Sequence, residues 1–397
     1  MRIRICLVIF SLFLLTACVA NEAVEDSSQA ISEKSDFSGS EETVEPSEPS
    51  EISKETSEQE IIEETMGEKL VKSLTLEEKV GQLFLAAYPD VGAESYISDC
   101  HLGGFIMFGR EFKGSTPEQI KAKIGSHQES AKIPLLFAVD EEGGTVCRVS
   151  AYSQFRESRF PSPRTLFNKG GIDAIIEAEQ EKCVLLKSLG INVNMAPVCD
   201  ITTEKSAFMY SRSLGQSPEI TAEFVKSVIS VTDENNIGNV LKHFPGYGNN
   251  VDTHIGIAVD ERTLDELEGI DLIPFKAGVE SGCGAILVSH TIVKCLDGEM
   301  PASLSKAVHD YIRGTLGFDG VIVTDDLTMQ AITDNYGSGE AAVLAVMAGN
   351  DLICCSNFKV QYNAVLQAVR DGRISIEQVD EACARVIDWK YKLGLIE

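Results

Sequence analysis

Short apolar runs that alternate with longer amphipathic segments are the feature of this sequence that most constrains its fold. Continuous apolar runs separated by helical patterns are typical of parallel strands that are covered by helices on the outside. Eight such runs therefore predict an α/β fold built as a (β/α)8 TIM-type barrel. The runs are Val80–Tyr88, Gly104–Phe108, Pro134–Val139, Val193–Val198, Asn239–Lys242, Ala285–Val288, Val321–Thr324 and Asp351–Cys354.

Six segments between the runs carry a clear helical pattern. The first has a start signal: Thr116 is the expected N-cap, Pro117 takes the first helical position, and Gln119 can complete a capping box. The stretch of about 330 residues is long for an ordinary domain but normal for an α/β barrel, so we assign residues 66–397 to a single barrel domain. The six segments are Pro117–Gly125, Ala174–Leu189, Ile220–Asn235, Leu264–Ser281, Gly339–Ala348 and Ser375–Leu393.

Polar clusters follow or close four of the apolar runs, as a barrel requires of its functional residues. Active sites of such barrels lie just beyond the C-terminal ends of the strands. A doubly wound open sheet would also alternate strands and helices, but no glycine fingerprint follows the first strand here. We therefore expect one functional face, formed by the clusters Asp140-Glu141-Glu142-Gly143-Gly144, Lys242-His243, Ser289-His290 and Asp325-Asp326.

The N-terminus has the pattern of a secretory signal. Arg2 and Arg4 precede an apolar run, Ile5–Leu15, that is too short to span a bilayer. The following Leu-Thr-Ala-Cys resembles a bacterial lipobox, in which Cys18 would take two acyl chains and hold the protein to a membrane. We assign residues 1–18 as a lipoprotein signal peptide and expect an extracytoplasmic protein anchored by lipid to the bacterial cell membrane. The alternative is an ordinary cleaved signal with an incidental cysteine.

Residues 19–65 are predicted to form a disordered acidic tether. Residues 21–65 contain 15 Asp and Glu against Lys34 and Lys54, a net charge of −13. Such a segment cannot bury enough apolar surface to offset its ordering entropy, and its like charges extend it. The net charge of the whole chain, −27, argues against a nucleic-acid partner.

Nine of the 11 cysteines lie beyond the predicted signal peptide. Their number is odd, their spacings match no zinc or haem pattern, and several fall inside apolar runs. We expect buried free thiols, although the compartment also permits a disulfide or two. The sequence leaves the oligomeric state open.

Several motifs occur in order along nearly the whole chain after the tether. They are Val139-Asp140-Glu141-Glu142-Gly143-Gly144 with Arg148, Met195-Ala196-Pro197-Val198-Cys199-Asp200, Ser211-Arg212-Ser213, Lys242-His243-Phe244-Pro245-Gly246-Tyr247-Gly248, Asp252-Thr253-His254 and Val323-Thr324-Asp325-Asp326-Leu327-Thr328-Met329. Together they resemble the family 3 glycoside hydrolases, and specifically their NagZ-type β-N-acetylhexosaminidases. The ordered set is far more specific than any single motif.

The resemblance implies a double-displacement mechanism with Asp325 as nucleophile and Asp252 with His254 as general acid/base. A retaining glycosidase needs a carboxylate that attacks the anomeric carbon and a second group that protonates the leaving oxygen. The unperturbed pKa of a histidine already lies near working pH, and Asp252 could select the tautomer of His254. Asp326 is expected to be a structural neighbour, because an Asp at a strand end commonly caps a helix or bonds within its loop.

The resemblance also implies a subsite for the terminal sugar, formed by Asp140, Arg148, Arg212, Lys242 and His243. A carboxylate accepts hydroxyl hydrogen bonds, and arginines offer forked donors to hydroxyls or an acetamido carbonyl. The glycine pairs beside these residues would be tight turns even without a ligand. The sequence departs from the family pattern in three places, which leaves the leaving-group preference open: Tyr247, where histidine is frequent, and Thr145 and Cys147, where longer polar residues are frequent.

The expected function is therefore the release of terminal β-linked N-acetylglucosamine from muropeptides or related glycans, without a cofactor or metal. Four alternatives stay open at this point. They are a phosphorylase that uses phosphate instead of water, a β-glucosidase of the same family, a lipoprotein that only binds sugars, and a metal-dependent barrel hydrolase using His243, His254, His290 and Asp325. The last would commonly need a close histidine pair early in the chain, which the first strand lacks.

Overall fold

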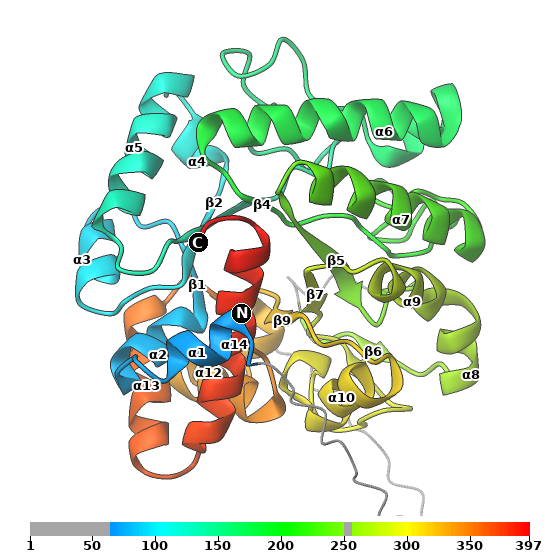
Figure 1. Cartoon of the computed structure of the whole chain (residues 1–397). Helices are drawn as coiled ribbons and strands as arrows, with labels where there is room; N and C mark the ends of the chain where they lie inside the picture. Colours follow the sequence, from blue (N-terminus) through cyan, green and yellow to red (C-terminus); the bar gives the residue numbers. More distant parts are fainter. Residues whose placement is uncertain (1–63, 250–255) are drawn as a thin grey trace, which may run out of the picture. The chain divides into compact units, whose positions relative to one another are not determined.

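The computed structural model describes residues 64–249 and 256–397. Eight parallel strands form one sheet in the order β10-β1-β2-β3-β4-β5-β7-β9. A parallel bridge between Val323 and Leu352, with the Thr324 N–H donating to the Leu352 carbonyl at 3.1 Å, brings the two edges together into a nearly closed barrel (Figure 1). The strands are β1 (Phe84–Ala87), β2 (Gly104–Met107), β3 (Leu136–Val139), β4 (Val193–Asn194), β5 (Gly238–Phe244), β7 (Ala285–Val288), β9 (Val321–Thr324) and β10 (Ile353–Cys355).

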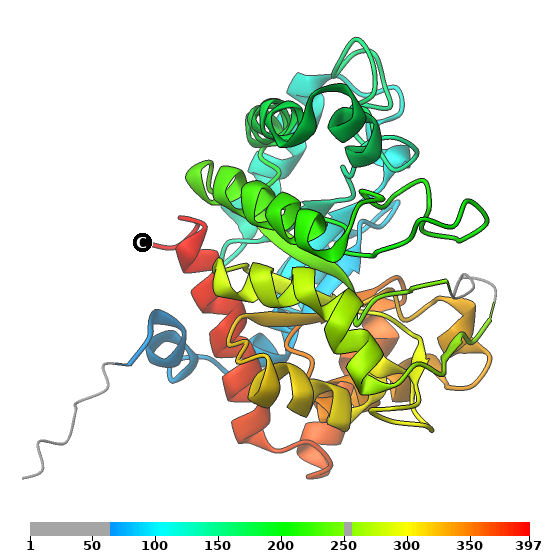
Figure 2. The same cartoon turned by 90° about the vertical axis from the view of Figure 1, so that its right-hand side faces the viewer.

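Helices cover the outside of these strands, which confirms the predicted (β/α)8 fold class (Figures 1 and 2). A second, two-stranded parallel sheet pairs β6 (Val259–Asp260) with β8 (Ile292–Val293). The helices are α1 (Met66–Val71), α2 (Leu76–Gln82), α3 (Ala93–Ser98), α4 (Gly109–Phe112), α5 (Pro117–Ser130), α6 (Pro163–Leu189), α7 (Pro218–Glu234), α8 (Leu264–Glu266), η2 (Leu267–Asp271), α9 (Leu272–Glu280), η3 (Ala302–Leu304), α10 (Lys306–Asp310), η4 (Tyr311–Thr315), α11 (Gln330–Thr333), α12 (Ser338–Ala348), α13 (Phe358–Arg370) and α14 (Ile376–Lys392).

The predicted strand at Val80–Tyr88 was wrong in its first part, which belongs to α2. Thr75 caps this helix: its side chain accepts from the Glu78 N–H, and the Glu78 carboxylate accepts from the Thr75 N–H at 2.9 Å. Val80, Gly81 and Gln82 are buried just as the following strand is, so the apolar run continues across the helix–strand junction. The run Val193–Val198 was likewise too long, because only its first two residues form β4.

All six predicted helical segments are helical, and the capping box of α5 is confirmed. Thr116 accepts from the Gln119 N–H at 3.3 Å, and the Gln119 side chain accepts from the Thr116 N–H at 2.9 Å. Helix α6 begins earlier than predicted and is interrupted at Gly170 and Gly171, where Gly171 has a φ of +66°. The segment Leu264–Ser281 is divided by the π-helical turn η2. Helix α13 was not among the predicted segments.

The single tryptophan closes the N-terminal end of the barrel. Trp389 of α14 packs in the cluster of inward-pointing strand residues that also contains Leu85, Val240 and Val323. The position just before β7 requires a glycine, Gly284, because a Cβ there would lie 2.2 Å from Trp389 Nε1. A site can therefore form at the other end of the barrel, where the C-terminal ends of the strands lie.

The nine described cysteines are free thiols, and eight of them are buried, so the structure agrees with the expected buried thiols. Within residues 64–249 and 256–397, no helix combines the length and apolar character that crossing a membrane requires. The predicted signal peptide with Cys18, and residues 19–63 of the predicted tether, lie outside the described residues.

Lys390 of α14 is a buried lysine whose titration makes the stability of the fold depend on pH. Its Nζ donates to Gln82 Oε1 at 2.6 Å, and Gln82 in turn donates to the His101 carbonyl at 2.7 Å. Burial lowers the pKa of Lys390 to about 7, whereas the pKa of a lysine in an unfolded chain is about 10.4. Between these values the unfolded chain binds more protons than the folded chain, so this residue makes stability rise with pH.

We expect Lys390→Met to remove this dependence. Relative to the variant, the wild-type protein should gain stability at up to about 1.4 kcal/mol per pH unit between pH 7 and 10, because one proton separates its two states there. Urea unfolding of both proteins at pH 7, 8, 9 and 10 measures the difference, and the comparison cancels the titration of all other groups. A difference that stays constant over this range would contradict the account.

Candidate active site

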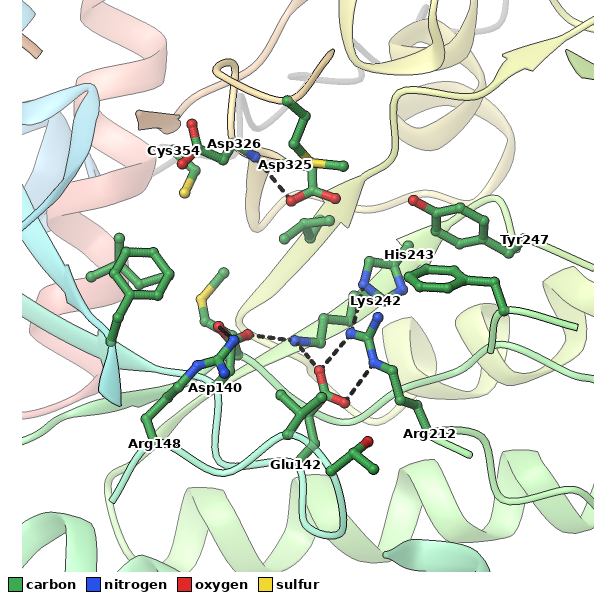
Figure 3. Close-up of a pocket in the computed structure, with 18 of the residues that line it drawn as sticks. Asp140, Glu142, Arg148, Arg212, Lys242, His243, Tyr247, Asp325, Asp326 and Cys354 are labelled. Atoms are coloured by element: carbon green, nitrogen blue, oxygen red, sulfur yellow. Dashed lines mark hydrogen bonds and ion pairs between the residues drawn. The ribbon is translucent and has the colours of Figure 1, made fainter. Parts of the chain in front are cut away.

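A pocket of about 680 Å³ opens at the C-terminal ends of the strands. Its polar lining comes from the loops that follow β3, β4 and β9 and from the end of β5 (Figure 3). Apolar side chains complete the walls. The lining includes Phe108, Asp140, Glu142, Arg148, Met195, Phe208, Arg212, Lys242, His243, Tyr247, Asp325, Asp326, Met329 and Cys354.

Two carboxylates and two cations form a connected network on one side of the pocket. Lys242 Nζ lies 2.7 Å from Asp140 Oδ1 and 2.7 Å from Glu142 Oε1. Two nitrogens of Arg212 donate to the Glu142 carboxylate: Nε to Oε2 at 2.9 Å and Nη2 to Oε1 at 2.6 Å. An ammonium has three hydrogens, so one hydrogen of Lys242 has no acceptor among the described residues, and the only described partner of the second oxygen of Asp140 is the distant Nη2 of Arg148, at 3.5 Å.

The charged groups of this network keep one another ionised. Burial would raise the pKa of Glu142, but the charges of Lys242 and Arg212 outweigh it and hold that pKa well below its usual value. Burial likewise opposes the charged forms of Asp140 and Lys242, yet their mutual attraction lowers the pKa of Asp140 and raises the pKa of Lys242. The charges of Asp140, Glu142 and Lys242 therefore stay constant over the pH range in which a histidine titrates.

His243 is held by protein groups at both ring nitrogens. Its Nδ1 lies 2.8 Å from Asp200 Oδ2, and its Nε2 lies 3.2 Å from Arg212 Nη2. An arginine can only donate, so Nε2 accepts and the proton sits on Nδ1, where it is donated to Asp200. The other oxygen of Asp200 accepts from the Tyr247 N–H at 2.7 Å. Asp200 thus orients both His243 and the turn that follows β5.

Asp325 directly follows β9 and stands across the pocket from Glu142, with Lys242 and His243 between them in Figure 3. Its backbone N–H donates to the Val288 carbonyl at 3.1 Å, and its Oδ1 accepts from the Asp326 N–H at 2.9 Å. Both carboxylate oxygens of Asp326 accept hydrogen bonds from loop residues: Oδ1 accepts from the Thr328 N–H, and Oδ2 accepts from Ser356 Oγ at 2.6 Å. The structural role expected for Asp326 agrees with these bonds.

Glu141, between Asp140 and Glu142 in the sequence, holds the loop that carries Arg148. Its buried carboxylate accepts from the backbone N–H groups of Arg148 at 2.8 Å and Val149 at 2.7 Å. Gly143 and Gly144 have φ values of +104° and +66°, so the tight turn expected there is present. The Arg148 guanidinium also lies over the Phe108 ring, 5.9 Å from its centroid.

Six residues singled out from the sequence line this one pocket: Asp140, Arg148, Arg212, Lys242, His243 and Asp325. Asp252 and His254 lie outside the described residues. Sequence reasoning did not select Glu142 and Asp200 as site residues, although Glu142 stands in a polar cluster after a strand and both belong to quoted motifs. In the described part of the chain, no three His, Cys, Asp or Glu side chains are arranged to hold a metal ion.

Comparison with known proteins agrees with this architecture. Residues 75–389 match the family described as the glycosyl hydrolase family 3 N-terminal domain. The β-hexosaminidase of Nitrosomonas eutropha is 35% identical over 266 residues, which make up 64% of this chain and 74% of that protein. The β-hexosaminidase LpqI of Mycobacterium tuberculosis is 31% identical over 335 residues, or 80% of this chain and 83% of that protein.

A solved structure is similar as well. The family 3 β-N-acetylglucosaminidase from Paenibacillus sp. str. FPU-7 has 33% sequence identity and a TM-score of 0.77, and the match covers 81% of this chain. The chain spans 63% of the length of that enzyme. The family match itself extends from the N-cap of α2 to Trp389 of α14, well over half of the chain. The chain therefore belongs to glycoside hydrolase family 3.

Proposed function

We propose that this family 3 enzyme is a retaining glycosidase that releases terminal β-linked N-acetylglucosamine. The observation that carries the proposal is a carboxylate, Asp325, facing the charged network of Asp140, Glu142 and Lys242 across one pocket. The names of the relatives, β-hexosaminidase and β-N-acetylglucosaminidase, support the choice of sugar. A protein that only binds sugars would gain nothing from a reactive carboxylate at this position.

The reaction would proceed in two displacements. In the first, an oxygen of Asp325 bonds to the anomeric carbon while the bond to the leaving oxygen breaks, and His254 donates a proton to that oxygen. In the second, water gives a proton to His254 and attacks the same carbon, which frees Asp325. Asp252 would orient and stabilise the imidazolium of His254. The two inversions return a product with the original β configuration.

The terminal sugar would be held by the network opposite Asp325. The Lys242 hydrogen that no described residue accepts, and the Asp140 oxygen that is 3.5 Å from Arg148 Nη2, would supply a donor and an acceptor for neighbouring hydroxyls. The Arg148 side chain is partly exposed and can donate to the sugar, whereas Nε and Nη2 of Arg212 already donate to Glu142. We propose that Arg212 and His243 mainly shape the subsite.

Water is the acceptor we propose. Among the described pocket residues, the three cations Arg148, Arg212 and Lys242 each contact a carboxylate, so their charges are already partly balanced and attract a phosphate dianion less strongly. For the natural substrate we propose a muropeptide fragment, on resemblance and expected compartment; chitin oligosaccharides and other glycans are the alternatives.

A substrate screen tests this function. The purified protein should hydrolyse 4-nitrophenyl N-acetyl-β-glucosaminide and turn over the corresponding β-glucoside far more slowly. A muropeptide disaccharide and chitobiose, assayed side by side, would distinguish the natural substrate classes. Equal or faster turnover of the glucoside would point to a β-glucosidase, and no turnover of either aryl glycoside would leave a binding protein.

We also propose that Cys18 anchors the protein to the cell membrane through lipid. The expected result of Cys18→Ala is a soluble, active enzyme, or an unprocessed precursor that is held only by its signal peptide. Membrane fractionation with N-terminal sequencing of the recovered protein distinguishes these species from the anchored form. Mature Cys18→Ala protein that lacks the signal peptide but stays in the membrane fraction would exclude the lipid anchor.

A further inference from the structure

We propose that Arg262 is a positioning residue that ties together the two chain segments flanking residues 249–258. This inference rests on the proposed function, because that stretch contains Asp252 and His254. One segment is the turn Gly246–Gly248 that follows β5, and the other is β6, which ends at Asp260. Both segments are described, and Arg262 contacts both.

The guanidinium of Arg262 reaches three different parts of the chain. Its Nε lies 3.0 Å from Asp260 Oδ1, and its Nη2 lies 2.6 Å from Asp260 Oδ2. Its Nη1 lies 2.5 Å from Asp271 Oδ2 at the end of η2. Its Nη2 also donates to the Gly246 carbonyl at 3.1 Å, which is the link to the turn after β5. Only a planar fork can serve these groups together.

The turn after β5 is packed directly on this ion pair. Gly246 has a φ of +117°, and a Cβ there would lie 2.5 Å from Asp271 Oδ1. Gly248 has a φ of +53°, and a Cβ there would lie 2.8 Å from Arg262 Cζ. Both glycines of this turn are therefore needed for the close approach of the backbone to Arg262 and Asp271. The turn has no room to shift toward the pair.

The second flanking segment is anchored independently of the turn. In the small parallel sheet, the Ile292 N–H donates to the Ala258 carbonyl at 2.9 Å, and the Lys294 N–H donates to the Asp260 carbonyl at 3.0 Å. β6 is thus tied to the chain that follows β7. Because Arg262 binds both Asp260 of β6 and the Gly246 carbonyl of the turn, it holds these two segments at a fixed separation.

The charge of Arg262 is also required. Asp260 and Asp271 are buried, and burial raises the pKa of Asp271 to about 7 even beside the guanidinium. Removing the cation would leave two buried carboxylates without their counter-charge, which is strongly destabilising. Arg262→Lys is the informative variant, because it keeps the charge but cannot bridge Asp260, Asp271 and Gly246 at once.

A matched control exists at the opposite end of the barrel. The Arg313 side chain is 22% exposed and that of Arg262 is 27% exposed, and each pairs with a carboxylate that is 1% exposed, Asp351 or Asp271. Arg313 likewise ties backbone together, since its Nη1 donates to the Phe318 and Gly320 carbonyls at 2.7 Å each. Gly320 precedes β9, so this cluster lies away from the pocket. Arg313→Lys replaces a guanidinium of similar exposure without touching the flanking segments.

The test measures kcat/KM, which reports glycosyl transfer to the enzyme, for aryl N-acetyl-β-glucosaminides of decreasing leaving-group ability. For Arg262→Lys we expect about a tenfold loss with phenyl as the leaving group and less than about a threefold loss with dinitrophenyl, because a misplaced acid affects only leaving groups that need a proton. Asp260→Asn, which weakens the same bridge, should give a smaller loss of the same kind. Arg313→Lys should lose activity equally across the series, if at all.

His254→Ala separates this inference from the proposed function. If His254→Ala is selective for poor leaving groups and folded Arg262→Lys and Asp260→Asn are not, the positioning role is wrong while the acid assignment stands. If His254→Ala shows no such selectivity, the acid assignment itself fails. Thermal unfolding of each variant verifies that it is folded. If the loss of kcat/KM for Arg262→Lys equals that for Arg313→Lys at every leaving group, Arg262 has a structural role only.

Discussion

Replacing Asp325 with alanine is expected to lower kcat by roughly 10⁴-fold or more, because the covalent route loses its nucleophile. The fold should survive, since the carboxylate has one described hydrogen bond, from the adjacent Asp326 N–H, and its side chain is partly exposed. Steady-state rates with an activated aryl N-acetyl-β-glucosaminide measure the loss. Thermal unfolding of the variant should match that of the wild-type protein.

The neighbouring carboxylate is the control for this prediction. Asp326→Asn keeps the side-chain shape and an acceptor for Thr328, and Ser356 can rotate its hydroxyl to suit. We expect a much smaller loss of kcat than for Asp325→Ala. If the Asp326 variant lost as much activity as the Asp325 variant while remaining folded, the roles of the two residues would have to be reconsidered.

The second large effect concerns His254. We expect His254→Ala to lower kcat/KM by about 10²-fold or more for poor leaving groups and far less for activated ones, because only poor leaving groups need a proton on the departing oxygen. Asp252→Asn should show the same selectivity with a smaller loss, since it weakens control of the imidazole. Equal losses across the leaving-group series would exclude His254 as the acid.

The same enzyme preparations identify the acceptor. A deprotonated carboxylate would repel an incoming anion, but a neutral imidazole would not, so phosphate could in principle compete with water. We expect free N-acetylglucosamine as the main product in both phosphate and non-phosphate buffers. N-acetylglucosamine 1-phosphate as the main product in phosphate would make the enzyme a phosphorylase.

The barrel could be predicted from the sequence because its strands are buried on both faces. A strand such as Val321–Thr324 is therefore apolar up to its last residue, and the charged residues that begin at Asp325 mark its carboxyl end. The same property explains the error at Val80–Gln82, where a buried helix turn runs directly into a buried strand. Helix α13 could have been found, since Phe358, Tyr362, Val365 and Leu366 form a buried stripe at helical spacing.

The pocket residues could be placed at strand ends, but their pairings could not be predicted. Arg212 meets Glu142 across 70 positions of sequence, and His243 meets Asp200 across 43. These pairings depend on how the loops after β3, β4 and β5 converge, which no local pattern encodes. The sequence therefore suggested Arg212 and His243 as groups that contact sugar, whereas in the structure both are largely engaged by buried carboxylates. Arg262 had no motif to mark it, because its role follows from three distant contacts.

The claim at the centre of this account is that Asp325 forms a covalent glycosyl-enzyme intermediate with N-acetylglucosamine. The direct measurement is mass spectrometry of the wild-type enzyme incubated with a slow fluorinated N-acetylglucosaminyl substrate, followed by proteolysis and peptide sequencing. We predict one added sugar per chain, carried by Asp325, and no label on Asp325→Ala. A label on Asp326 or Asp140, or rapid turnover through a product of inverted configuration without any adduct, would contradict the account.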